Sequence, residues 1–157
     1  MSRFTSLAVF LFLVIAAAGI GSQFPAGGYY ALLDKPDWAP PAWLFGPVWS
    51  VLYVMIAVAM WQVWQTGQQA RIGALVWWLL QLSLNAAWTW LFFGLTRTGW
   101  AMAEIAVLIG VVILCIKAFS LVSKSAAWLM LPYLLWLIFA FLLNFSLWSR
   151  NGGGIHF

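Results

Sequence analysis

Aromatic and amide side chains recur at helical spacing within one apolar stretch of the sequence, residues 73–95. They are Trp78, Gln81, Asn85, Trp88 and Phe92. Because their spacings alternate between three and four, these side chains share one face of a helix. An unpaired amide facing lipid is costly, so we expect Gln81 and Asn85 to point into a protein interior. Such a face suits a pocket for a flat, largely apolar ligand. The alternative is an ordinary helix interface with amides bonding across it.

Two further apolar stretches contribute large side chains, and one of them adds a small residue and an amide. In residues 126–148 they are Trp136, Ala140 and Asn144, each four positions apart, with Trp148 beyond. In residues 45–64 they are Trp49, Tyr53 and Met60. We therefore expect three helices to direct aromatic and amide side chains toward one interior.

The sequence offers few residues for metal binding or conventional catalysis. The only histidine, His156, lies in the tail, so no intramembrane histidine pair could ligate haem iron. Cys115 is the only cysteine, and no Cys/His/carboxylate cluster or Ser–His–Asp arrangement is evident. Glu104 is the sole carboxylate within an apolar stretch. It could couple to protons, but near a helix end we favour a solvated or interface-paired carboxylate.

The composition indicates that lipid surrounds the helices carrying these residues. Of 157 residues, 66% are hydrophobic and 6% are charged, and the mean hydropathy is +0.99. A soluble domain carries about a quarter charged residues. The basic residues are single and scattered, so we interpret the net charge of +4 as charges flanking helix ends and exclude a nucleic-acid partner.

Five apolar stretches are long enough to cross a membrane as helices. They cover about residues 4–21, 45–64, 73–95, 100–121 and 126–148. We predict an all-α integral membrane protein, a five-transmembrane-helix bundle in a single domain over residues 1–157. The apolar runs are continuous rather than alternating, which excludes a membrane β-barrel.

The first apolar stretch has a second interpretation. Arg3, an apolar run and the small residues at 16–19 are also typical of a cleavable signal peptide. We favour an uncleaved helix, because Ala17 and Gly21 form a small-xxx-small pair suited to helix packing. The basic residues divide four against three between the two sides, and this count does not decide the orientation.

The long connection over residues 22–44 is rich in proline, glycine and aromatic residues. A loop of this length is usually functional or disordered, and its aromatic content argues against disorder. We expect it to cap the bundle between the first and second helices.

Motifs along nearly the whole chain resemble those of the TspO/translocator protein family. They are Lys35-Pro36-Asp37-Trp38-Ala39-Pro40-Pro41, Phe45-Gly46-Pro47-Val48-Trp49 with Leu52-Tyr53, Leu84-Asn85-Ala86-Ala87-Trp88, and Leu131-Pro132-Tyr133-Leu134-Leu135-Trp136 with Phe139-Ala140 and Leu143-Asn144. This family is also called tryptophan-rich sensory proteins or peripheral-type benzodiazepine receptors.

The resemblance implies a homodimeric five-helix bundle whose first loop caps a pocket for porphyrins and for isoquinoline carboxamide or benzodiazepine ligands. The ligand-binding residues it implies are Tyr30, Trp38, Pro40, Trp49, Tyr53, Asn85, Trp88, Trp136, Ala140 and Asn144. In some members, tryptophans matching Trp49 and Trp136 take part in light- and oxygen-dependent porphyrin breakdown. The basic residue of the sterol motif in animal members is absent here, which argues against high-affinity cholesterol binding.

We therefore interpret the chain as a membrane receptor or sensor that binds protoporphyrin IX-type tetrapyrroles and regulates tetrapyrrole metabolism or a stress response. Two alternatives stay open. One is a porphyrin-degrading enzyme with Trp49 and Trp136 as catalytic residues. The other is a transporter of porphyrin or another amphiphile, with Glu104 coupled to protons. We expect a bacterial membrane location, no required cofactor and no metal.

Overall fold

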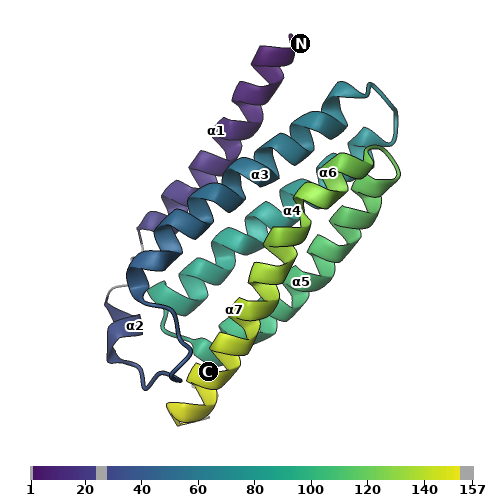
Figure 1. The fold of residues 1–157 in the computed structure, drawn as a ribbon. Coiled ribbons are helices and arrows are strands. Elements are labelled where there is room, and N and C mark those ends of the chain that lie inside the picture. Colours follow the sequence, from purple (N-terminus) through teal and green to yellow (C-terminus); the bar gives the residue numbers. More distant parts are fainter. Residues whose placement is uncertain (1, 24–27, 153–157) are drawn as a thin grey trace.

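The computed structural model describes residues 2–23 and 28–152, and over these residues it is all-helical. The α-helices are α1 (Arg3–Ser22), α2 (Tyr29–Leu32), α3 (Phe45–Gln65), α4 (Arg71–Thr89), α5 (Thr98–Ser120), α6 (Lys124–Leu129) and α7 (Leu131–Arg150). A 3₁₀ turn, η1 (Ala42–Leu44), precedes α3, and a π-helical turn, η2 (Trp90–Gly94), continues α4. Figure 1 shows the long helices side by side in one elongated bundle.

Among the described residues, four helical segments are long and apolar enough to cross a membrane. They are Arg3–Ser22, Ala42–Gln65, Thr98–Ser120 and Lys124–Arg150. The chain is therefore an integral membrane protein. The remaining long helix, α4, has 19 residues and is the least apolar of the five. Its amides Gln81 and Asn85 lower its hydropathy, yet both are buried inside the bundle. The count of five crossings stays a prediction.

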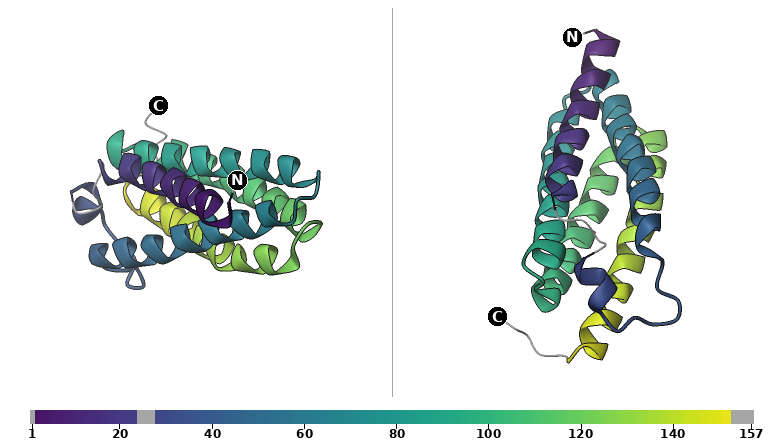
Figure 2. Two further views of the ribbon diagram at one scale, coloured as in Figure 1. Left: turned by 90° about the horizontal axis from the view of Figure 1, so that it is seen from above. Right: turned by 90° about the vertical axis from the view of Figure 1, so that its left-hand side faces the viewer.

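Helix neighbours in the bundle follow from their contacts. Helix α4 packs along α5, α5 along α7, and α1 against both α3 and α4. Figure 2 shows α1 lying over α3 and α4, and Figure 1 shows α2 at the end of the bundle where α7 ends. The small residues Ala17 and Gly21, predicted to serve helix packing, lie on α1. At Gly21, α1 approaches α4: a Cβ there would lie 3.5 Å from Thr89 Cγ2.

The expected single helix over residues 126–148 is divided in two at Met130. Helix α6 ends at Leu129, and α7 begins at Leu131 with a proline in its first turn. Because Pro132 has no N–H, it cannot donate to the carbonyl four residues earlier, and its ring would clash there. The continuous apolar run concealed this break.

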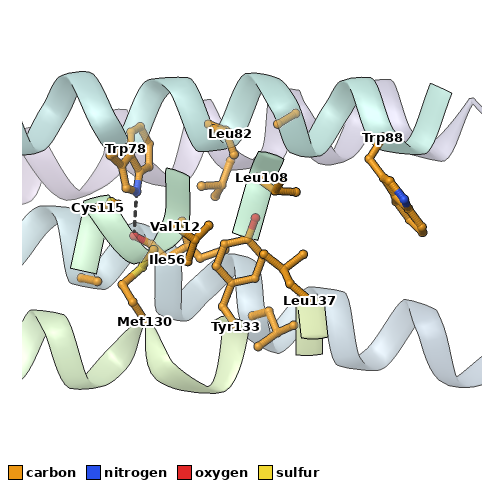
Figure 3. Packing of buried hydrophobic residues seen from close by; sticks show 14 of the residues in the cluster. Ile56, Trp78, Leu82, Trp88, Leu108, Val112, Cys115, Met130, Tyr133 and Leu137 are labelled. Atoms are coloured by element: carbon orange, nitrogen blue, oxygen red, sulfur yellow. Dashed lines mark hydrogen bonds between the residues drawn. The ribbon is translucent and has the colours of Figure 1, made fainter. Parts of the chain in front are cut away.

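The centre of the bundle is filled by large side chains from several helices. The side chains of Trp78, Ile56 and Tyr133 are fully buried. The Trp78 indole N–H donates to the Ile56 carbonyl of α3 at 3.0 Å, the dashed line in Figure 3. In lipid, where helices gain little from hydrophobic burial against each other, such packing and interhelical hydrogen bonds hold the bundle together.

Candidate functional site

The stripe predicted on residues 73–95 faces the interior. Trp78, Gln81, Asn85, Trp88 and Phe92 are all buried. Helical periodicity and the cost of an amide in lipid were sufficient to predict this face. The outward side of the same helix carries exposed apolar residues such as Val76 and Leu80.

Asn85 links three helices by hydrogen bonds. The Tyr53 hydroxyl of α3 donates to Asn85 Oδ1 at 2.7 Å. Asn85 Nδ2 in turn donates to the Tyr133 hydroxyl of α7 at 3.3 Å. The Asn85 amide is therefore occupied by protein partners, as the helix-interface alternative predicted.

Asn144 also bonds across a helix interface. With its amide oriented to suit its neighbours, it donates to the Thr98 carbonyl and accepts from the Met102 N–H of α5, each at 3.1 Å. Both predicted site amides thus hold helices together, which leaves aromatic side chains to line the free space.

A cavity of about 550 Å³ opens at the loop end of the bundle, among α1, α3 and α4. We call it the open cavity. Its lining residues are Ala18, Gly21, Ser22, Ala42, Trp43, Phe45, Gly46, Trp49, Ser50, Tyr53, Trp88, Thr89 and Phe93. Three of the predicted ligand-binding residues, Trp49, Tyr53 and Trp88, lie together on its wall. Its volume falls within the range of about 300–1,000 Å³ that is usual for small-molecule sites.

A second space of only about 10 Å³ lies deeper, next to α7, and we call it the closed cavity. Its lining residues are Tyr30, Phe45, Trp88, Phe92, Phe93, Ala140, Leu143, Asn144 and Leu147. Tyr30, Ala140 and Asn144 of the predicted site therefore lie here, separated from Trp49 and Tyr53.

Trp136 and Trp38 line neither cavity. The half-buried Trp136 packs edge-on against Phe45, with ring centroids 6.1 Å apart, and beside Phe139 at 5.2 Å. Trp38 is 51% exposed and rests its edge on Phe139. Trp49 and Trp136, the predicted redox pair, are therefore placed differently: Trp49 borders the open cavity, and Trp136 packs on Phe45 outside both cavities.

Sequence reasoning missed the contribution of α1 to the open cavity. Ala18, Gly21 and Ser22 line it from one face of that helix. Their small size and spacing were the available signal, but that pattern is equally typical of plain helix packing.

Residues 28–44 of the expected cap are tied to the end of α7, while residues 24–27 lie outside the described residues. Asn151 donates to the Asp34 carbonyl at 3.0 Å and accepts from the Asp34 N–H at 2.9 Å. Arg150 lies 3.8 Å from the Asp34 carboxylate. Lys35 Nζ donates to three loop carbonyls, which closes this part of the loop on itself.

Tyr30 anchors the inner side of the same loop. Its hydroxyl donates to the Pro40 carbonyl at 2.8 Å, and both residues are buried. Burial raises the pKa of the Tyr30 hydroxyl, because the charged phenolate loses its hydration there. Tyr30 and Pro40 also border a separate cleft of about 460 Å³ within the loop.

The expectation for Glu104 was wrong. Both carboxylate oxygens are buried and have no hydrogen-bond partner in the described part of the chain, so the group is neither solvated nor paired. Glu104 lies beside the buried face of α5 formed by Ala101, Ile105 and Leu108, which directs its head group inward. Within residues 2–23 and 28–152, no group of three or more His, Cys, Asp or Glu could hold a metal ion. His156 falls outside that part.

Comparison with known proteins shows the family of this chain. The model of the TspO/MBR family matches residues 7–149. The chain belongs to the TspO/MBR family. It is 39% identical to the "Tryptophan-rich protein TspO" of Chlorobaculum tepidum over 152 residues, which cover 93% of this chain and 96% of that protein.

Other TspO/MBR relatives come from distant organisms. The chain is 37% identical to the human "Translocator protein" over 85% of its own length and 83% of that protein. It is 34% identical to the "Tryptophan-rich sensory protein" of Cereibacter sphaeroides, over 87% and 85% respectively. The match to the family model covers nearly the full chain, and the matched residues include the first loop and the residues that line the open cavity.

Proposed function

We propose that this TspO/MBR protein is a membrane receptor that binds porphyrins of the protoporphyrin IX type, or similar flat apolar ligands, in the open cavity. In this proposal, occupancy regulates tetrapyrrole metabolism or a stress response. The observation that carries it is a cavity of about 550 Å³ bordered by Trp49, Tyr53 and Trp88. Flat aromatic ligands gain from offset or edge contacts with such rings.

The surroundings of the open cavity support this choice of ligand. Asn85 and Asn144 are engaged with protein partners. Recognition would then rely on ring contacts and shape, with the cavity's hydroxyl groups as the polar contacts. A relative named a tryptophan-rich sensory protein supports a sensing role for the family member described here.

A porphyrin titration tests this function. Protoporphyrin IX is added in the dark to the protein in lipid nanodiscs, and its visible absorbance is followed, with empty nanodiscs as the blank. Trp49→Ala and Trp88→Ala should each weaken binding by about tenfold or more, because each removes a ring from the cavity wall. Trp136→Ala should have a smaller effect, since Trp136 does not border the open cavity.

Trp128→Ala is the matched control, because Trp128 is 69% exposed on α6 and lines neither cavity. Its affinity should equal that of the wild type. Wild-type affinity in both the Trp49 and Trp88 variants would refute the open cavity as the porphyrin site.

One observation favours porphyrin photo-oxidation as a second candidate. Trp49 borders the open cavity and contacts two tyrosine rings, Tyr53 at 5.4 Å and Tyr133 at 6.1 Å between centroids. Light- and oxygen-dependent loss of porphyrin with a discrete product, abolished in Trp49→Phe, would support it. Equal bleaching by a nanodisc protein without this cavity would count against it.

We further propose that α4 is the fifth membrane-crossing helix. Its lower hydropathy reflects amides and tryptophans that the bundle buries, so its polar groups do not face lipid. Single cysteines placed at Gln69 and at Arg97, outside the two ends of the α4–η2 segment, should be labelled from opposite sides by a membrane-impermeant thiol reagent. Labelling of both from the same side would contradict a crossing.

A further inference from the structure

The open and closed cavities share a wall of three aromatic side chains. Phe45, Trp88 and Phe93 border both spaces. The two cavities are therefore adjacent compartments, and these side chains alone are common to both among the described lining residues.

Two of the three wall residues are held in an aromatic cluster. The Trp88 ring is stacked on Phe92 at 5.2 Å between centroids. Phe93 packs edge-on against Phe92 at 4.7 Å and against Trp88 at 5.9 Å. Rotating either ring would break several contacts.

Phe45 packs outside this aromatic cluster. It is half-buried at the first position of α3, and its ring contacts are edge contacts to Tyr30 at 5.4 Å and Trp136 at 6.1 Å. The next residue, Gly46, is exposed, and a Cβ there would have no atom within 4 Å. Gly46 also borders the open cavity, so the position next to Phe45 adds no side chain to that space.

The far side of Phe45 contains the small residue Ala140. The closed cavity of about 10 Å³ admits at most one water molecule. Displacing the Phe45 ring would add its volume to this space and connect it to the open cavity. A ligand could then contact Trp49 on one side and Ala140 on the other.

We propose that Phe45 is a specificity-determining residue that divides the ligand site into two compartments. This rests on the proposed function. With the ring in place, a ligand is confined to the open cavity, where it contacts Trp49 but not Ala140. With the ring displaced, the joined site lets a macrocycle extend from the open cavity to Ala140.

The division itself is tested without any porphyrin. A thiol introduced by Ala140→Cys is treated with methyl methanethiosulfonate in nanodiscs, and modification is followed by mass spectrometry. The chain lacking Ala140→Cys reports the background from the buried Cys115. Adding Phe45→Ala should raise the modification rate at least about tenfold, because the reagent then reaches position 140 from the open cavity.

Phe145→Ala is the matched control, since Phe145 is 50% exposed and borders neither cavity. It should leave the modification rate unchanged. Phe45→Leu, a milder change, should give an intermediate rate if Phe45→Ala loosens the fold. A rate in Phe45→Ala and Phe45→Leu equal to that with Phe45 intact would overturn the division.

A second experiment compares the affinities of the Phe45 variants for a large and a small ligand. Phe45→Ala should tighten protoporphyrin IX binding by about tenfold and change the affinity for 2-naphthol, a two-ring probe, by less than about threefold. Phe45→Trp should weaken porphyrin binding. Parallel changes for both ligands would refute a role in specificity. Absence of porphyrin binding by the wild type would refute the proposed function, while the thiol measurement would still decide the division.

Discussion

The Tyr53 hydroxyl donates to Asn85 Oδ1 at 2.7 Å, across the interface between α3 and α4. The same amide donates to Tyr133 of α7, so one side chain joins three helices beneath the open cavity. Tyr53 also borders that cavity. The hydrogen bonds that hold the bundle therefore also fix part of the cavity wall.

Removing this amide should destabilise the bundle. Asn85→Leu keeps the side-chain size but leaves the Tyr53 and Tyr133 hydroxyls unpaired in a buried setting. We expect a loss of about 1–2 kcal/mol in the free energy of unfolding, measured by denaturation in mixed micelles. Ser83→Ala on the exposed side of α4 is the control, because the Ser83 hydroxyl bonds only its own helix at Leu79. Equal stability of the two variants would show that the network contributes nothing.

The size of residue 21 should control access to the open cavity. Gly21→Ala places a Cβ 3.5 Å from Thr89 Cγ2, an ordinary contact, so stability should change by less than about 0.5 kcal/mol. Gly21→Phe should fill the cavity or separate α1 from α4, and porphyrin affinity should fall about tenfold or more. Gly19→Phe on the exposed side of α1 is the control, because nothing lies within 4 Å of its Cβ position. Wild-type affinity in Gly21→Phe would exclude α1 from the ligand site.

The paired hydrogen bonds between Asp34 and Asn151 should hold the loop against α7. Asn151→Ala removes both the acceptor of the Asp34 N–H and the donor to its carbonyl. Hydrogen exchange at the Asp34 amide should accelerate by about tenfold or more, because that amide loses its only protein acceptor in the described structure. Ser149→Ala, whose hydroxyl bonds only within α7, should leave exchange unchanged. An unaltered Asp34 exchange rate in Asn151→Ala would contradict the tether.

Alkaline pH should release the inner side of the loop through Tyr30. Burial raises its pKa above the ordinary value of about 10, so the neutral hydroxyl is favoured when the loop is docked. This contribution is complete below the pKa of the released loop and is lost as pH rises through the pKa of the docked loop. The ultraviolet absorbance of tyrosinate should titrate late in the wild type, and the wild-type curve minus the Tyr30→Phe curve should rise only above about pH 10. A difference between the two curves that is complete by about pH 10 would refute the assignment.

Some features of the fold and site could be predicted because they depend on neighbouring residues. The inward face of α4 followed from the spacing of Gln81 and Asn85. The break at Met130 has a local cause in Pro132, but an apolar run alone does not reveal it. The inward turn of the Glu104 carboxyl could not be predicted, because it depends on how residues of other helices pack around α5.

The sequence by itself determined that lipid is the solvent, that the chain is helical, and which face of α4 points inward. Each follows from composition or from a period of 3.6 residues, and the cost of an unpaired polar group in lipid enforces it. Only the tertiary structure decided that α1 lines the open cavity and that Phe45 borders both the open and the closed cavity. The shape of a cavity depends on the distances between helices and the rotamers of residues far apart in the chain, and no local pattern encodes these.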